Sequence, residues 1–228
     1  MDIIEKAVSK GQNSLSEFTS KQFLASYGIS VCQEQLVQSS QEAIERATKI
    51  GFPVVMKACG AELTHKTEEN LVRIGLKTPE EVLQAYRDLT QNDNKELEGI
   101  LLQEMVTGHR ELVMGLIRDA QFGPCVMFGF GGIFTEVLND VSFRVAPLEE
   151  WDAMEMMEEI RAKKILDAFR GEPPVDKDLL AKALITLGQI GLENPSIQEI
   201  DINPMKIHDG KPIAVDALIV LRGENEGD

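Results

Sequence analysis

Residues 197–221 read IQEIDINPMKIHDGKPIAVDALIVL and contain the most informative pattern in the chain. Two apolar segments flank Asp209-Gly210, a dipeptide typical of a tight turn. Alternation along the first segment places Ile200 and Ile202 on one face of an extended chain and the polar residues between them on the other. The stretch therefore predicts two neighbouring strands that form a hairpin.

Side chains with oxygen ligands lie inside both predicted strands. Glu199, Asp201 and Asn203 share one face of the first strand, and Asp216 interrupts the apolar run of the second. A carboxylate inside a buried strand is costly unless it is paired or holds a cation. Carboxylate and amide oxygens, with no Cys or His between them, suit Mg²⁺ held together with waters and phosphate oxygens. The pattern predicts a magnesium site, but a surface hairpin with one wet face shows the same alternation.

Composition limits the class of protein. With 228 residues, 43% of them hydrophobic and 27% charged, the chain fits a globular protein of one domain or two small lobes. Its net charge of -15 argues against a nucleic-acid partner, because phosphate binding needs a clustered basic surface. Neither a signal core nor an apolar run long enough to span a bilayer is present, so we expect a cytoplasmic protein without membrane contact. Three cysteines without CxxC spacing, Cys32, Cys59 and Cys125, favour buried free thiols.

Helices and strands alternate in the first half of the chain. Capping patterns predict helices that begin at Ser14, Ser39 and Thr78, the first two ending at Gly28 and Gly51. Strands are expected at residues 29–37, 53–57, 72–76 and 99–106. Further along, strands are expected at 111–118, 124–128 and 134–146, and helices at 148–164 and 179–190, the last with Asp176 as its cap and Gly191 after its end.

These elements predict an α/β (α+β) fold with two lobes and a cleft between them. We expect the lobes to join near Thr107-Gly108. The predicted division is an N-terminal helical extension (1–19), a first lobe (20–106), a second lobe (107–222) and a frayed, charged tail (223–228).

Several other residues are candidates for chemistry. Lys57 ends an apolar segment, where its ammonium either meets a phosphate or reaches water through its long stem. Gly129, Gly131 and Gly132 lie between two predicted strands and either approach a phosphate closely or permit a tight turn. Arg144 adds a charge that could face the cleft. His65, beside Lys66, is either a nucleophile for phosphoryl groups or a solvated loop histidine.

The segments together resemble the nucleotide-binding β subunit of the ADP-forming acyl-CoA synthetases (ADP-forming acetate-CoA ligases), relatives of succinyl-CoA ligase with an ATP-grasp fold. The resemblance runs from about Lys21 to Leu221. Its most specific stretch, residues 121–148, reads QFGPCVMFGFGGIFTEVLNDVSFRVAPL. Shorter matches are PVVMK at 53–57, LQEMV at 102–106, GEPP at 171–174 and EIDINP at 199–204.

The resemblance implies a role for each matching residue in binding ATP or ADP. Lys57 would contact the phosphates, the hinge at Glu104, Met105 and Val106 would receive adenine, and Glu111 would reach the ribose. Gly131, Gly132 and Arg144 would complete the nucleotide site. Asn203 and Asp216 would hold Mg²⁺ with Asp201 close by.

The resemblance also implies a reaction and a partner. His65 would relay phosphate between a histidine of a separate, CoA-binding α subunit and ADP, so that acyl-CoA, ADP and phosphate interconvert with free acid, CoA and ATP. CoA and the carboxylic acid would be bound through that partner, which makes a hetero-oligomer the expected state.

One departure from the family pattern leaves a second hypothesis open. Asn70 and Leu71 stand where the family usually has a pair of glycines, and Glu68 and Glu69 add negative charge beside the expected phosphohistidine. Lost backbone freedom and added acid could impair the relay. The alternative is a catalytically impaired nucleotide-binding module that regulates or assembles a CoA-ligase-like complex.

Overall fold

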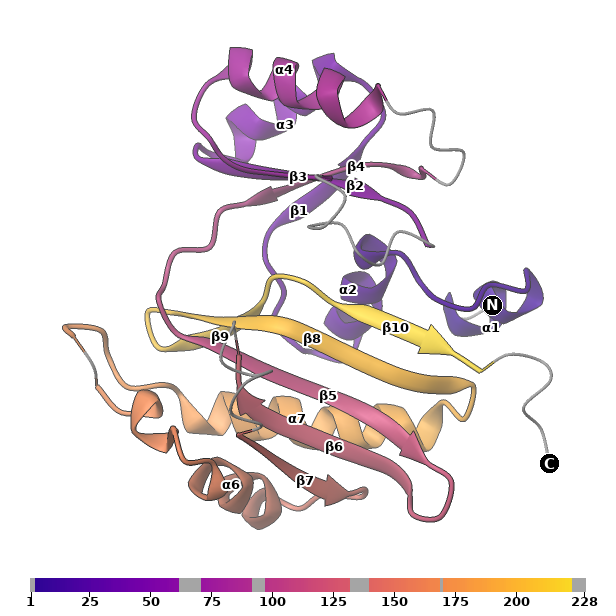
Figure 1. The fold of residues 1–228 in the computed structure, drawn as a ribbon, viewed down its shortest axis with the longest axis vertical. Coiled ribbons are helices and arrows are strands. Elements are labelled where there is room, and N and C mark those ends of the chain that lie inside the picture. The colour runs from indigo at the N-terminus through magenta and orange to yellow at the C-terminus, as the bar shows by residue number, and fades with distance from the viewer. Residues whose placement is uncertain (1–2, 62–70, 92–96, 132–139, 169, 223–228) are drawn as a thin grey trace.

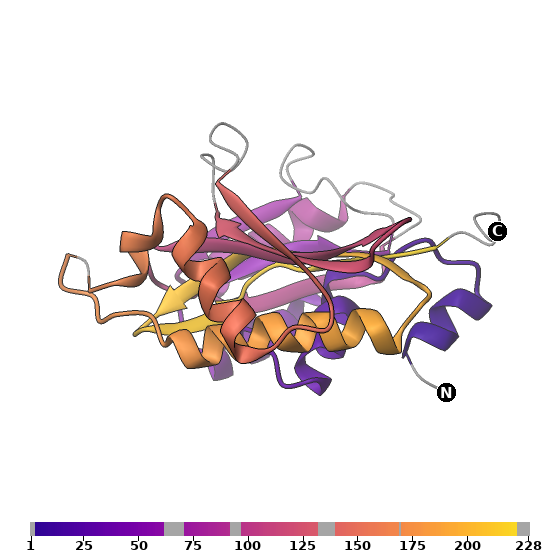
Figure 2. The same cartoon turned by 90° about the horizontal axis from the view of Figure 1, so that it is seen from below.

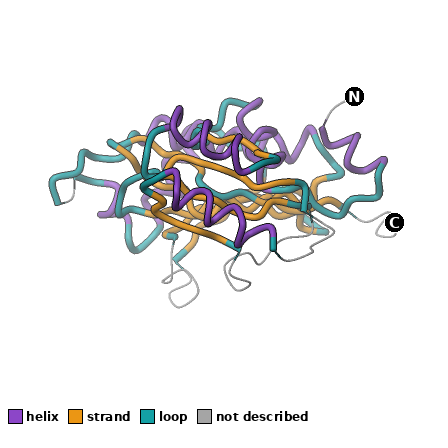
Figure 3. The backbone as a smooth tube through the Cα atoms, turned by 90° about the horizontal axis from the view of Figure 1, so that it is seen from above, coloured by secondary structure: helices purple, strands orange, loops and turns teal. Residues whose placement is uncertain are grey.

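The computed structural model describes residues 3–61, 71–91, 97–131, 140–168 and 170–222. They form two antiparallel sheets, one above the other in Figure 1, and each sheet has helices on one of its faces. Figure 3, coloured by secondary structure, shows the strands running between helices. Of the described helices, none combines the length and the apolar composition needed to cross a membrane.

The smaller sheet belongs to the first lobe. Its strands stand in the order β1 (Glu34–Val37), β4 (Gly99–Glu104), β2 (Val54–Cys59) and β3 (Val72–Leu76). Helices α3 (Ser40–Ile50) and α4 (Pro79–Thr90) cover one face, as the top of Figure 1 shows. Val54 and Met56 pack against these helices, so strand alternation turns Val55 and Lys57 to the opposite face.

The predicted caps of these two helices are confirmed. The hydroxyl of Ser39 accepts a hydrogen bond from the backbone N–H of Glu42, and that of Thr78 accepts one from the N–H of Glu81. Helix α3 ends at Gly51, whose φ of 98° suits glycine.

The larger sheet forms the second lobe. Its path is β10 (Leu218–Leu221), β8 (Ile197–His208), β5 (Glu111–Asp119), β6 (Gly123–Phe130) and β7 (Val141–Val145), and β9 (Lys211–Ala214) pairs with β8. Helices α6 (Glu150–Glu159) and α7 (Lys177–Glu193) lie under one face of the sheet in Figure 2, and η1 (Lys163–Leu166) follows α6. The main apolar core lies between these layers.

The N-terminal helices also pack on the larger lobe. Helix α1 (Ile3–Ser9) and helix α2 (Glu17–Ser26) contribute Ile4, Phe23 and Leu24 to the same apolar core. The α2 residues fall inside the range that the sequence assigned to the first lobe, and the division of the chain into domains stays a prediction.

Four predicted elements have different bounds in the structure. Helix α2 begins at Glu17 with Ser16 as its cap, because Ser14 instead bridges to Val220. Helix α7 keeps the predicted cap Asp176 but continues beyond Gly191 to Glu193. Gly191 lies inside the helix where it packs closely on the sheet, because a Cβ at this position would meet Leu116 Cδ1 at 2.4 Å. The predicted strand at 29–37 and helix at 148–164 are shorter, at the bounds of β1 and α6.

Three candidate residues occupy different positions in their strands than predicted. Strand β2 continues past Lys57 to Cys59, so Lys57 is an internal residue of the strand. Gly129 lies within β6 and pairs with Val141, where a Cβ would meet Asp140 O at 2.7 Å. The second strand of the C-terminal hairpin is split into β9 and β10, and Asp216 lies in the break between them.

The rest of that hairpin is confirmed. A turn at Asp209-Gly210 joins β8 to β9, and Ile200 and Ile202 point into the core. The free thiols of Cys32, Cys59 and Cys125 are buried, as predicted.

Candidate functional site: a cleft between the lobes

A cavity of about 250 Å³ lies between the two sheets. It is lined by residues from β2, β3, β4, β5 and β8 and from the segments that follow β4 and β9: Val55, Lys57, Val72, Ile74, Gln103, Glu104, Met105, Val106, Glu111, Pro204, Lys206, Val215 and Asp216. Both lobes therefore contribute walls, and the predicted interlobe cleft is present.

Lys57 is the cation at the base of this cleft. Its Nζ donates to Asp216 Oδ2 at 2.9 Å and to Glu17 Oε1 at 2.7 Å, and its side chain is only 7% exposed. Burial alone would lower the pKa of Lys57, but Asp216 and Glu17 raise it above its ordinary value. The ammonium thus neither reaches bulk water nor lacks a counter-charge.

The segment after β4 forms an apolar edge of the cleft. Met105 and Val106 line the cavity together with Val55 and Ile74. Glu104 is fixed there because its Oε1 accepts a 2.7 Å hydrogen bond from the backbone N–H of Gln33. An apolar slot of this kind is suited to a flat heterocycle such as adenine.

Glu111 also lines the cleft, with a partner that the sequence reading missed. Its Oε1 lies 3.2 Å from the Nζ of Lys206, a residue of β8. Strict alternation along β8 would turn Lys206 to the face opposite Asp201 and Asn203. The register of the β5–β8 pairing shifts between Leu112 and Met114 and reverses that expectation, so no local pattern indicated this contact.

Asp201, Asn203 and Asp216 are brought to one side of β8. Strand β8 pairs with β9 at Met205–Ala214 and with β10 at Asp201–Leu218. The same antiparallel register continued across the break between β9 and β10 places Asp216 opposite Asn203. Burial, and then the nearby carboxylates of Glu199 and Asp216, raise the pKa of Asp201 to about 6. These carboxylates repel one another in the absence of a cation.

The donor set fits a hard divalent cation. Within the ranges that the structure describes, no cluster of three or more His, Cys, Asp or Glu side chains is arranged as a metal site. Two carboxylates and an amide oxygen match the few protein ligands that Mg²⁺ takes when waters and phosphate oxygens complete its coordination.

Of the predicted glycines and the predicted histidine, the structure describes only Gly131 near the cleft. Gly131 lies beside the cleft wall, but its N–H already donates to Glu111 O at 2.8 Å, and a Cβ there would meet the backbone of Leu112 at 2.9 Å. This glycine permits a close approach between β5 and the end of β6. Gly132 and His65 lie outside the described residues.

Arg144 is held away from the lining of the cavity. On β7 its guanidinium bonds Glu155 at 2.7 Å and Glu159 at 2.8 Å, both on α6. Arg144, and then the hydroxyl of Ser142, lower the pKa of Glu159 to about 2. Arg144 therefore links the edge strand β7 to helix α6.

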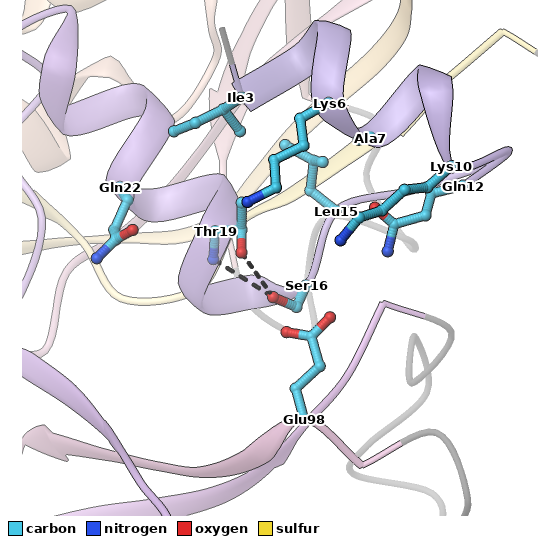
Figure 4. Close-up of a pocket in the computed structure, with 10 residues that line it drawn as sticks. All are labelled: Ile3, Lys6, Ala7, Lys10, Gln12, Leu15, Ser16, Thr19, Gln22 and Glu98. Atoms are coloured by element: carbon cyan, nitrogen blue, oxygen red, sulfur yellow. Dashed lines mark hydrogen bonds between the residues drawn. The ribbon is translucent and has the colours of Figure 1, made fainter. Parts of the chain in front are cut away.

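A second hollow, of about 350 Å³, lies beside α1 and α2. Figure 4 shows Lys6, Lys10 and the Glu98 carboxylate around it, with Ser16 bonded to Thr19 at its wall. It is larger than the cleft, but it lacks the buried cation and the facing carboxylates of the cleft. We therefore place the candidate site in the cleft.

Comparisons with known proteins identify the family of the chain. A model of the ATP-grasp domain matches residues 6–221. The Pyrococcus furiosus protein named acetate–CoA ligase [ADP-forming] I subunit beta is 43% identical over 225 residues, which cover 96% of this chain and 97% of that protein.

Solved structures of a dinucleotide forming acetyl-coenzyme A synthetase 1 from Ca. Korarchaeum cryptofilum are also similar. Its complex with coenzyme A, Ca-AMPCP and HgCl+ matches with a TM-score of 0.92 and 46% identity, covering 97% of this chain and 99% of that one. A complex of the same protein with coenzyme A and Mg-AMPPCP, with the phosphohistidine segment pointing towards the nucleotide binding site, matches with a TM-score of 0.86 and 45% identity over the same shares.

Proposed function

The chain belongs to the ATP-grasp family, and we propose that it is the nucleotide-binding subunit of an ADP-forming acyl-CoA synthetase. It transfers a phosphoryl group between a phosphohistidine and ADP, so that acyl-CoA, ADP and phosphate interconvert with free acid, CoA and ATP. One observation carries the proposal: Lys57 of one lobe and Asp216 of the other meet in a single cleft that also has an apolar slot.

The cleft offers separate places for the parts of ADP. The adenine ring fits between Val55, Ile74 and the segment Met105–Val106. Its phosphates then extend towards Lys57, whose buried ammonium neutralises their charge with little rearrangement. Glu111 lines the cavity and could accept a hydrogen bond from a ribose hydroxyl if its ion pair with Lys206 opens.

Asp201, Asn203 and Asp216 would hold magnesium at the phosphate end. When bound, Mg²⁺ supplies charge neutralisation on the phosphate oxygens and helps to align the transfer. The carboxylates of Asp201 and Asp216 gain a counter-charge there, which offsets their mutual repulsion.

The transfer itself involves one bond broken and one formed. A terminal oxygen of ADP attacks the phosphorus of phosphohistidine, the N–P bond breaks with its electron pair returning to the imidazole, and the new O–P bond completes ATP. The reverse reaction regenerates phosphohistidine. We assign the carrier role to His65, on the resemblance of its Thr-His-Lys segment to the phosphohistidine position of the family.

The function requires a partner. The Pyrococcus furiosus relative is named as a subunit beta, and it has nearly the same length as this chain. We infer a separate α subunit that binds CoA and the carboxylic acid and carries the other phosphohistidine, in a hetero-oligomer with this chain.

The experiment is phosphoryl labelling of the complex. The chain is co-purified with its α partner and incubated with γ-labelled ATP and Mg²⁺, and the label is mapped by mass spectrometry. Acid-labile label on His65 of this chain is expected. Turnover with an acid and CoA in the absence of any label on a histidine of this chain would overturn the assignment.

A second candidate function has one observation in its favour. Leu71, at a position where the family usually has glycine, is 5% exposed and packs with Ala58, and its carbonyl accepts a hydrogen bond from Ala58 N–H at 2.9 Å. A side chain anchored next to the predicted phosphohistidine segment suits a module that binds nucleotide and regulates or assembles the complex without relaying phosphate. Saturable Mg-ADP binding combined with no labelling in the assembled complex would favour this candidate.

A further inference from the structure

We infer that Glu17 is a positioning residue: it keeps Lys57 in the cleft when Mg-nucleotide takes Asp216 away from it. Lys57 is held by two carboxylates, Glu17 at 2.7 Å and Asp216 at 2.9 Å. The inference rests on the proposed function, because it concerns what happens to this pair when a nucleotide arrives.

The two carboxylates differ in access to the cleft. The Asp216 side chain is 37% exposed and lines the cavity, so an incoming cation can reach it. The Glu17 side chain is 1% exposed and lies behind Lys57, outside the cavity lining. Asp216 is therefore the exchangeable partner of Lys57, and Glu17 is the permanent one.

Glu17 is itself fixed by a second buried lysine. Its Oε1 accepts from Lys21 Nζ at 2.8 Å as well as from Lys57 Nζ. Lys21 is fully buried and also donates to Gln103 Oε1 at 3.0 Å and to Val215 O at 3.1 Å. Gln103 belongs to β4 of the first lobe, and Val215 follows β9 of the second lobe. Through Lys21, Glu17 is therefore anchored to both lobes and stays in place if Lys57 shifts.

The network explains how the pair can open. Moving one member of a buried ion pair away leaves the other uncompensated, which is strongly unfavourable. When Asp216 turns to the metal, Lys57 keeps Glu17 and gains the phosphates. Without the Glu17 charge, Lys21 would keep Glu34, but Lys57 would keep only Asp216 and the carbonyl of Val215. The two ammonium groups would also lose the carboxylate that lies between them. Mg²⁺ would then compete with Lys57 for that carboxylate.

The test is the Mg²⁺ dependence of ADP binding. The full chain is titrated with ADP by calorimetry over a series of free Mg²⁺ concentrations, in the wild type and in Glu17→Gln. We expect the half-saturating Mg²⁺ concentration to rise by about tenfold in the variant, which corresponds to the loss of one hydrogen bond to a charged group. Glu17→Asp, which keeps the charge on a shorter side chain, should shift it by less.

Two controls separate positioning from folding. Glu172→Gln removes a carboxylate from another buried pair, 2.9 Å from Arg110 Nε and outside the cleft, and should leave the Mg²⁺ dependence as in the wild type. Adenosine, which lacks phosphates, should bind Glu17→Gln as it binds the wild type. Equal weakening of adenosine and Mg-ADP would show a structural role only and overturn the inference.

The remaining outcomes are equally decisive. If the wild type binds ADP with Mg²⁺ and Glu17→Gln has the same Mg²⁺ dependence, the role of Glu17 is overturned while the proposed function stands. If the wild type binds no nucleotide, the proposed function itself fails. Should Glu17→Gln not fold, Glu17→Asp carries the test, and an unchanged Mg²⁺ dependence there overturns the inference.

Discussion

Lys57 and Asp216 come from opposite lobes, and their charged atoms lie 2.9 Å apart at the base of the cleft. Lys57 is the predicted phosphate ligand and Asp216 a predicted metal ligand. In the structure each serves as a counter-charge of the other. Mg-nucleotide supplies both replacements at once, a cation for Asp216 and an anion for Lys57, so we expect metal and nucleotide to bind cooperatively.

The first prediction concerns Asp216. Asp216→Ala should weaken Mg-dependent ADP binding by on the order of a hundredfold, because the metal loses one of its carboxylate ligands. Lys57 keeps Glu17, so the fold should persist. Calorimetry with and without Mg²⁺ measures the effect, with Asp209→Asn at the exposed turn of the same hairpin as the control. Unchanged affinity would remove the hairpin from the site.

The second prediction concerns the phosphoryl carrier. In the complex with the α partner, His65→Ala should bind ADP nearly as the wild type does but form no ATP, because a histidine nitrogen must bond to phosphorus in the relay. ATP formation from acyl-CoA, ADP and phosphate is the measurement. His109→Ala, an exposed histidine, should retain activity. Wild-type turnover in His65→Ala would reject the relay.

The third prediction is a pH effect at Asp201. Its pKa of about 6 in the folded protein lies above the ordinary value of 3.8, so the charged form destabilises the folded state. The stability that the protonated carboxyl contributes is complete below about pH 4 and is lost as the pH rises through 6. In Mg²⁺-free buffer, Asp201→Asn should therefore raise the Tm by about 3 °C at pH 7.5.

The Tm advantage of Asp201→Asn should shrink as the pH falls from 6 to 4, because the wild-type carboxyl then becomes neutral too. Thermal unfolding followed by circular dichroism over this range measures it. A difference between the two proteins that does not change with pH would contradict the assigned cause.

The fourth prediction tests the close approach of α7 to the sheet. Gly191→Ala places a Cβ 2.4 Å from Leu116 Cδ1 and 2.7 Å from Pro124 Cβ. Overpacking of this kind costs about 1–3 kcal/mol, which exceeds the gain of up to about 1 kcal/mol in helix propensity. Urea unfolding should show a net loss of stability. Gly188→Ala, on the same helix with its nearest atom at 3.2 Å, should be close to neutral, and equal losses in both variants would contradict the packing argument.

Much of the fold could be predicted because local physics specifies it. Ser39, Thr78 and Asp176 cap their helices through hydrogen bonds to residues three positions later, which a sequence displays directly. Alternation over residues 199–203 correctly separated the buried Ile200 and Ile202 from the polar residues between them. The order of helices and strands predicted the two lobes, and the resemblance to the ATP-grasp acyl-CoA synthetases, confirmed by the comparisons, named the fold.

The errors arose where a distant segment overrides a local signal. Ser14 has a capping pattern, but its pairing with Val220 moves the start of the helix to Glu17. Gly191 looks like a helix stop, yet the sheet beneath it requires a small residue inside the helix. In both cases the competing partner is remote in the sequence and gives no local sign.

Most helices and strands, the family and the residue types that can hold a nucleotide and a metal could be read from the amino-acid sequence. Which charges meet became clear only in the folded chain: Lys57 with Glu17 and Asp216, Glu111 with Lys206, and Arg144 with α6. The cause is the separation of these residues along the chain. Hydrogen-bonding and packing preferences act between near neighbours in the chain, whereas the Lys57–Asp216 pair joins residues 159 positions apart and forms only when both lobes have folded around the cleft.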